Sequence, residues 1–222
     1  MRKSITNIWI GAFFLLLTLS GLQNNLKAQT MEPPIPIEFL FGNKQMHFQM
    51  MMKKTFAPDS RLGFFTIATY SVQNQDFSDV DITIPVLIYY NFWKGFSAVV
   101  GTSLNSLTGF SPQVGIQHNY ASRQILAVTV ASININTGCD LNILGIYEYK
   151  PPINETWSLY NRVQFMYNFS MKKGTHNRSY LNLRTGVKRK SLTFGFGANL
   201  DQYGPYKTYA DNYGVFIMRE FR

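Results

Sequence analysis

Hydrophobic and polar residues alternate with a period of two along much of this chain. In WSLYNRVQFMYNF, residues 157–169, the odd-numbered positions are apolar except for Asn161, and the even-numbered positions are mostly polar, with Arg162 near the middle. Successive side chains of a strand point to opposite faces, so this segment has one apolar, aromatic face and one mostly polar face. Three further segments repeat the alternation: residues 81–92, 178–189 and 191–201.

The same alternation, interrupted by short polar breaks, predicts an all-β fold. No segment after the N-terminal region shows a convincing helical period. The first predicted strand has the weakest pattern. The predicted strands are residues 37–42, 44–54, 62–73, 81–92, 95–106, 110–120, 124–136, 140–150, 156–169, 178–189, 191–201 and 212–221.

Two of these segments depart from simple alternation. Within 124–136, apolar residues run from Leu126 to Val130 on one parity and continue at Ile133 on the other. A β-bulge would reset the register in this way, so we expect one there. The segment 62–73 is apolar on both parities, which leaves its orientation open.

The breaks alternate in length when counted back from the C-terminus. Residues 189–191 and 94–95 are short breaks, whereas residues 202–211 and 172–177 are long ones. Short turns at one end and longer loops at the other are typical of outer-membrane barrels. With the C-terminus in the periplasm, this count also places residues 57–61 on the periplasmic side.

Strand length and charge content both bear on which face is outside. Most predicted strands exceed the usual length of about five or six residues in soluble sheets, and a tilted strand needs about 9–11 residues to cross a bilayer. Charged residues make up only 15% of the chain, against roughly 25% in soluble domains. We therefore predict a single antiparallel transmembrane β-barrel of about twelve strands, with its apolar faces in lipid. A ten-stranded barrel with the N-terminal stretch in the lumen is the second expectation.

The N-terminus has the features of a secretory signal peptide. Arg2 and Lys3 precede an apolar run at residues 8–22, and Ala28 ends a plausible cleavage site. The alternative is a membrane anchor, but the run is shorter than the ~20 residues of a spanning helix. The predicted organisation is a cleaved signal peptide at residues 1–28, a proline-rich lead-in with a candidate first strand at 29–43, and an outer-membrane barrel at 44–222.

The net charge of the mature chain indicates which partners it can bind, and its cysteine content bears on how it is stabilised. The formal charge of +9 falls to +6 after cleavage, because the signal peptide carries three basic and no acidic residues. An exported protein rarely meets nucleic acid, so outer-membrane lipids and an anionic solute are the expected partners. Cys139 is the only cysteine, so no intramolecular disulfide is available, and a closed barrel would supply the stability instead.

The C-terminal segment YGVFIMREFR resembles the closing strand of outer-membrane barrels. The whole chain resembles small uncharacterised outer-membrane β-barrels of Bacteroidota, through Ala28-Gln29, PIEFLFGN, FGFGANLDQYG and the final REF. Arg219 and the terminal Arg222 depart from the closing pattern. This resemblance implies location in the cell outer membrane and no particular activity. It also implies recognition by the barrel assembly machinery through Tyr213, Val215, Ile217 and Phe221.

Charged residues on the polar parity form the candidate site. Five basic residues against one acid, Glu148, are expected to point into the lumen from three adjacent strands. Buried charges must be paired or hydrated, so one hypothesis is an ion-pair network with Glu148 bound to Arg162 or Lys188, and Asp81 and Asp201 reducing the surplus. The other is a basic lumen that binds or passes anions. The candidate cluster is Glu148, Lys150, Arg162, Arg178, Arg184 and Lys188.

Little in the sequence points to catalysis, a metal or a cofactor. The three histidines have no metal-ligand spacing. His176 lies in a predicted loop near Ser179, with Asp201 or Asp211 as the best acid partner, so an outer-rim enzyme acting on lipid is one alternative. A soluble periplasmic lipid-binding barrel is another. We expect a non-enzymatic outer-membrane barrel, with a polar, basic lumen and a structural or narrow-pore (porin-like) role.

Overall fold

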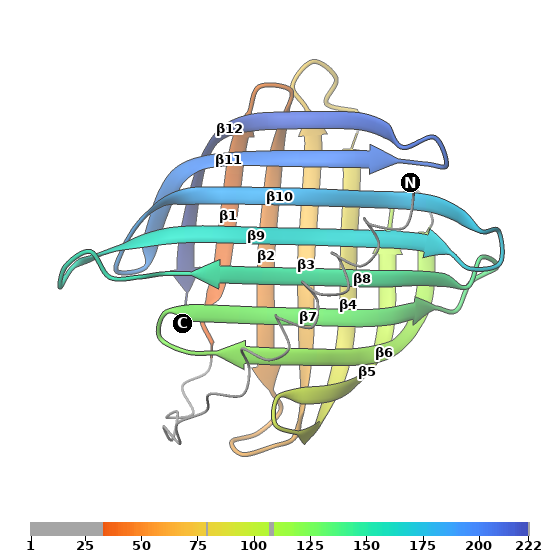
Figure 1. Ribbon diagram of the computed structural model, residues 1–222, viewed down its shortest axis with the longest axis horizontal. Helices are drawn as coiled ribbons and strands as arrows, with labels where there is room; N and C mark the ends of the chain where they lie inside the picture. The colour runs from red at the N-terminus through yellow and green to blue at the C-terminus, as the bar shows by residue number, and fades with distance from the viewer. Residues whose placement is uncertain (1–32, 79, 107–108, 222) are drawn as a thin grey trace, which may run out of the picture. The chain divides into compact units, whose positions relative to one another are not determined.

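The computed structural model describes residues 33–78, 80–106 and 109–221, and these residues form a closed antiparallel barrel of twelve strands (Figure 1). Each strand pairs with its neighbours in sequence, and β1 pairs with β12 to close the ring. The predicted fold class and strand number are therefore confirmed. The predicted signal peptide and the start of the lead-in lie outside the described residues.

The observed strands follow the predicted segments closely. Their bounds are β1 Ile35–Gly42, β2 Gln45–Thr55, β3 Leu62–Gln73, β4 Val80–Trp93, β5 Phe96–Asn105, β6 Gly109–Ala121, β7 Ile125–Asn134, β8 Asp140–Tyr149, β9 Trp157–Ser170, β10 Thr175–Arg189, β11 Leu192–Tyr203 and β12 Thr208–Phe221.

The start of β1 and the end of β12 lie at the same end of the barrel, which distinguishes the two mouths. The terminal mouth is the end at which β1 begins and β12 finishes, where Ile35 pairs with Phe221. The distal mouth is the opposite end and carries the connections β1–β2, β3–β4, β5–β6, β7–β8, β9–β10 and β11–β12.

The prediction of long loops at one end only was wrong. The connection 204–207 at the distal mouth is shorter than 150–156 at the terminal mouth. The polar residues assigned to the long loop belong to the sheet, because Thr208 pairs with Tyr203 and Tyr209 pairs with Gln202. Ladder hydrogen bonds do not require apolar side chains, so the strands continue past the apolar part of the pattern.

The outer face of the barrel is apolar and its inner face is largely polar. Val163 is 42% exposed, whereas the next residue, Gln164, is completely buried in the lumen. Large apolar side chains are exposed on strand after strand around the barrel, among them Phe41, Val100, Ile116, Phe196 and Val215. The predicted assignment of the two faces of residues 157–169 is therefore confirmed.

The bulge predicted in residues 124–136 is absent. The registers of β7 with β6 and β8 run without a shift. Val128 and Val130 simply point inward and are buried, whereas Ile133 faces outward. Strand β3 has the same arrangement, with Phe65 and Ile67 buried inside. Part of the lumen wall is thus apolar, which is why these two segments departed from the expected alternation.

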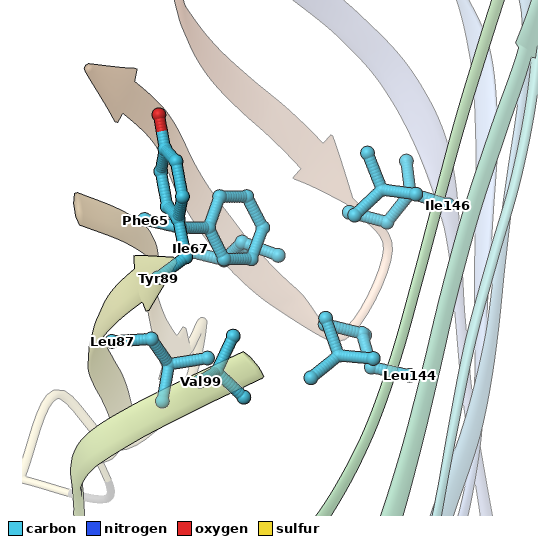
Figure 2. Close-up of a cluster of buried hydrophobic side chains, with 9 residues drawn as sticks. Phe65, Ile67, Leu87, Tyr89, Val99, Leu144 and Ile146 are labelled. Atoms are coloured by element: carbon cyan, nitrogen blue, oxygen red, sulfur yellow. The ribbon is translucent and has the colours of Figure 1, made fainter. Parts of the chain in front are cut away.

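Apolar side chains from opposite walls meet inside the barrel. Strands β7–β11 run across β1–β4 in Figure 1, as strands tilted on opposite walls of a barrel must. Figure 2 shows side chains of β3, β4 and β5 facing Leu144 and Ile146 of β8 across the interior. The cluster comprises Phe65, Ile67, Leu87, Tyr89, Val99, Val128, Val130, Leu144 and Ile146. This part of the interior is packed like the core of a soluble protein.

Candidate functional site

The centre of the lumen holds one carboxylate between two arginines. Glu38 of β1 accepts hydrogen bonds from Arg162 of β9 at 2.7 Å and from Nε of Arg184 of β10 at 2.8 Å. The side chains are almost completely buried, with exposures of 1%, 3% and 0%. Because β12, β11 and β10 separate β1 from β9 in the ring, the Glu38–Arg162 pair joins distant parts of the wall. We call these three residues the central triad.

Arg184 is held by further contacts besides Glu38. Its Nη1 donates to the side-chain oxygen of Asn199 at 2.8 Å and to the carbonyl of Leu183 at 2.9 Å. A Cβ atom on Gly197 would lie 2.9 Å from Cδ of Arg184 and 2.8 Å from Cδ1 of Leu40. An inward-facing glycine, which has no side chain, thus makes the space that the arginine occupies.

A second contact crosses the lumen beside the central triad. The amide nitrogen of Gln49 on β2 donates to the side-chain oxygen of Gln164 on β9 at 3.0 Å. Gln164 in turn donates to the hydroxyl of Tyr180 at 3.2 Å. Tyr180 also packs against the apolar cluster that contains the residues of Figure 2. Polar and apolar contacts therefore both bridge the interior.

Charged groups near the terminal mouth form two separate pairs. Lys150 lies 2.8 Å from Glu148, which also accepts a hydrogen bond from the hydroxyl of Tyr160 at 2.8 Å. Lys188 is paired with Glu220 of β12. The predicted bond from Glu148 to Arg162 or Lys188 is therefore wrong. Glu148 and Arg162 are cross-strand neighbours, but the Arg162 guanidinium reaches Glu38 instead.

The distal part of the lumen is organised by Arg178. Its guanidinium lies 2.7 Å from Asp81 of β4 and 2.9 Å from Asp201 of β11. The same group stands over the ring of Tyr203, 4.8 Å from its centroid. Arg178 therefore joins opposite walls near the distal mouth, as the central triad does deeper inside.

The predicted basic surplus is wrong for the candidate cluster. Every basic residue named in it has a carboxylate partner, and the cluster is divided among three levels of the lumen. The expectation missed Glu38 and Glu220. Glu38 could have been found, because it shares a parity with Leu40 while Ile37 and the two phenylalanines of PIEFLFG share the other. The lumen contains ion pairs, as one hypothesis expected, but the acids that bind Arg162 and Lys188 are Glu38 and Glu220.

His176 lies in β10 rather than in a loop, and it contacts a serine. Its Nε2 is 3.0 Å from the hydroxyl of Ser179, and its Nδ1 is 2.7 Å from the carbonyl of Gly204. The register of β9 and β10 shifts between His176 and Arg178, which places His176 and Ser179 on the same, outer face. The two acids expected as partners are paired with other residues, Asp201 with Arg178 and Asp211 with Lys44.

Within residues 33–78, 80–106 and 109–221, no group of three acidic, histidine or cysteine side chains could hold a metal ion. The same residues contain no helix of the length and apolar character needed to span a membrane.

Comparison with known proteins gives a general likeness to barrels of known structure. The chain matches no protein-family model and no curated protein sequence. The KdgM porin in complex with disordered oligogalacturonate aligns with 85% of this chain and 99% of its own, at 12% identity and a TM-score of 0.47. The NanC porin aligns with 86% and 99%, at 8% identity and a TM-score of 0.49. OmpT, an outer membrane protein of Vibrio cholerae, aligns with 85% and 96%, at 8% identity and a TM-score of 0.38.

The fold defines the class, a closed twelve-stranded antiparallel barrel with a polar, ion-paired interior. Structures that are only 8–12% identical in sequence to this chain show its fold alone. Evidence for a function has to come from the residues of this barrel.

Proposed function

We propose that this protein is a non-catalytic outer-membrane barrel with a structural role, because buried ion pairs close its lumen; a narrow pore is the role that this closure argues against. The observation that carries the proposal is the central triad inside an apolar-faced closed barrel. Soluble monomers rarely expose contiguous apolar patches larger than a few hundred Å². Here the exposed apolar side chains belong to strands all around the ring. Lipid is the solvent that such a surface fits, and a closed barrel leaves no unpaired strand edge in it.

The closing strand supports delivery to the outer membrane. Tyr213, Val215, Ile217 and Phe221 all lie on the outer face of β12, with exposures of 43–52%. In this proposal they face lipid in the finished barrel and are read by the barrel assembly machinery before closure. The signal peptide would bring the chain to that machinery. Both chain ends would then face the periplasm, and the distal mouth the cell exterior.

The central triad favours a closed lumen over an anion path. An open anion path needs basic groups that face water in the pore, whereas Arg162 and Arg184 are buried and bound to the carboxylate of Glu38. Separating these groups would leave charges unpaired at a buried position, which is costly. Barrels of about eight strands are filled by side chains and channels are typical at sixteen or more. Twelve strands lie between these sizes, so the support for a closed lumen comes from the contacts across it.

Location and barrel state are tested together by fractionation and gel migration. The full chain is expressed in a Gram-negative host, and its membranes are separated and run on a gel with and without heating. The proposal expects outer-membrane enrichment and a folded band that migrates differently when unheated. Soluble periplasmic material would contradict it and favour a soluble lipid-binding barrel.

A second candidate function, a rim enzyme acting on lipid, is favoured by the contact between His176 and Ser179. A carbonyl can only accept, so Nδ1 of His176 carries the proton donated to Gly204. Nε2 is then free to accept the Ser179 proton. This is the orientation in which a histidine activates a serine as a nucleophile. In ester hydrolysis the serine oxygen would attack the acyl carbonyl, His176 would pass the proton to the leaving alcohol, and water would release the acid.

We favour a structural role for this pair. The group that orients His176 is a backbone carbonyl rather than a carboxylate, and the histidine is 6% exposed, beside the ring of Tyr167. The hydrogen bond from Nδ1 of His176 to the carbonyl of Gly204 joins β10 to the β11–β12 turn. Lipid hydrolysis by the purified barrel is compared with that of Ser179→Ala, and His176→Gln serves as the second variant. We expect no lipase activity in any of the three proteins. Activity that is lost in both variants while the folded gel band remains would establish the enzyme.

A further inference from the structure

The distal part of the lumen contains two adjoining cavities, together called the distal vestibule. The inner cavity has a volume of about 170 Å³ and the outer one, at the rim, about 310 Å³. Five residues line both: Gln45, Ser71, Asp81, Asp201 and Tyr203. The vestibule leads from the distal mouth down to Leu144, Met166 and Tyr180, which belong to or pack against the apolar cluster.

Acidic groups outnumber basic groups in the inner cavity. Asp81, Asp140 and Asp201 line it, and the basic side chains among the described residues that line it are those of Arg178 and His47. Arg178 is shared between Asp81 and Asp201, so the formal charge of this lining is −2 with His47 neutral. A cavity lined by one sign of charge raises the local concentration of oppositely charged solutes. The vestibule therefore favours a cation, the opposite of the anionic solute expected from the sequence.

Buried hydrogen-bond acceptors in the same wall lack a donor. Asp140 is 7% exposed, and its Oδ2 accepts from Asn136 at 2.7 Å while its Oδ1 has no partner. Asn182 is 4% exposed, and its side-chain oxygen is also without a partner. Both residues line the inner cavity. A buried acceptor without a donor is destabilising, so these oxygens mark positions that suit N–H or O–H groups of a ligand.

The rest of the wall suits a hydroxylated molecule. Amide side chains both donate and accept hydrogen bonds, as do neighbouring hydroxyls on a sugar ring. The amide side chains that line the inner cavity include those of Gln45, Gln113, Asn142, Asn168, Asn182 and Asn199. Tyr180 and Tyr203 add aromatic surface. Ligand pockets for drug-sized molecules are typically 300–1,000 Å³. The inner cavity, at about 170 Å³, is smaller, so it suits a ligand no larger than a small sugar.

We propose that the distal vestibule binds a small cationic solute rich in O–H and N–H donors, of the amino-sugar class. The ammonium group lies against Asp140, and the hydroxyls contact the amide side chains. The site is at the mouth, so binding holds whether the lumen below is closed or conducts. A failure of this inference therefore leaves the proposed function standing.

Calorimetric titration of the full-length folded barrel in detergent tests the proposal with three probes. Glucosamine carries a positive charge at neutral pH, N-acetylglucosamine is neutral and glucuronate is anionic. We expect saturable binding of glucosamine, weaker binding of the neutral sugar, and none of glucuronate. Added salt should weaken glucosamine binding, because screening acts on the charge term. Absence of saturable glucosamine binding, or equal binding of glucuronate, would overturn the proposal.

Substitutions of residues that line the inner cavity test whether glucosamine binds in the vestibule. Asp140→Asn should weaken glucosamine binding about tenfold, since hydrogen bonds to charged groups are the stronger ones. Asn182→Ala provides a second, uncharged test at the same cavity. Glu220→Gln, at the terminal mouth, is the matched control and should leave binding unchanged. Heat-dependent gel migration confirms that each variant is folded. Equal binding by folded Asp140→Asn, Asn182→Ala and wild type would contradict the assignment.

Discussion

Glu38 and Arg184 are 146 residues apart in the chain, yet the Nε of Arg184 lies 2.8 Å from the carboxylate of Glu38 in the middle of the barrel. Arg162 binds the same carboxylate from the next strand. One acid is thus bound to two buried bases, and the three groups together keep a formal charge of +1. This arrangement makes the lumen sensitive to the loss of Glu38.

Replacing Glu38 with Gln should destabilise the barrel strongly. The substitution keeps the shape but leaves two buried arginines without a carboxylate, and breaking a buried pair costs about 3–5 kcal/mol. Urea unfolding in lipid vesicles, followed by tryptophan fluorescence, measures the loss. The control is Glu220→Gln, whose pair with Lys188 is more accessible and should cost less. Equal losses in the two variants would contradict a special role for Glu38.

Removing the whole central triad should restore much of that stability. Apolar residues of similar volume in place of a buried ion pair are often neutral or stabilising. The variant Glu38→Met/Arg162→Met/Arg184→Met is therefore expected to unfold at higher urea than Glu38→Gln. A triple variant less stable than the single one would show that the neighbours Asn199 and Gln164 depend on the charges themselves.

An arginine at Val163 should block assembly. Val163 is exposed on the outer face, and an arginine facing lipid at mid-bilayer costs roughly 2–4 kcal/mol. Gln164, the neighbour on the inner face, is completely buried and bonded to Gln49, so an arginine there would also be costly. The suitable control is Asn168→Arg, in the polar vestibule on the same strand. Similar yields of Val163→Arg and Asn168→Arg in washed outer membranes would argue against a lipid-facing surface.

Valine in place of Gly197 should destabilise the barrel by about 1–3 kcal/mol, the usual range for overpacking. The new side chain would collide with Arg184 and Leu40 in the lumen. Ala198→Val, one residue along and on the outer face, adds the same kind of bulk toward lipid and should be tolerated. The unfolding midpoints of the two variants in urea provide the comparison. Tolerance of Gly197→Val would mean that the arginine has room to move.

The period-two pattern was sufficient to predict the strands and, where the alternation is clear, which side chains face outward; it failed for residues 62–73 and 124–136. It could not predict the partners of the charges, because those partners come from different strands. Glu38 and Arg162 meet only because closure of the barrel and the tilt of its strands bring β1 and β9 together across the lumen. The inward valines at 128 and 130 show a related limit, since an apolar patch inside a barrel and a register shift give the same sequence pattern.

In the candidate site, too, the sequence predicted the direction of a side chain within its strand but not the contacts that depend on how strands pair. Arg178, Arg184 and Lys188 were placed in the lumen correctly, because parity is a local property. The Ser179–His176 contact was missed because it depends on the register shift after His176, which puts residues three apart on one face. The alternation in this segment is too weak to reveal a shift of one residue.

Conductance of the wild-type barrel in a planar bilayer tests the central claim most directly. A lumen bridged by Glu38, Arg162 and Arg184, by Gln49 and Gln164, and by the apolar cluster should give no steady current. Glu38→Gln, if it folds, should conduct intermittently and favour anions, because it leaves the two arginines uncompensated. Stable, anion-selective current through the wild-type protein would contradict the account of a lumen closed by ion pairs.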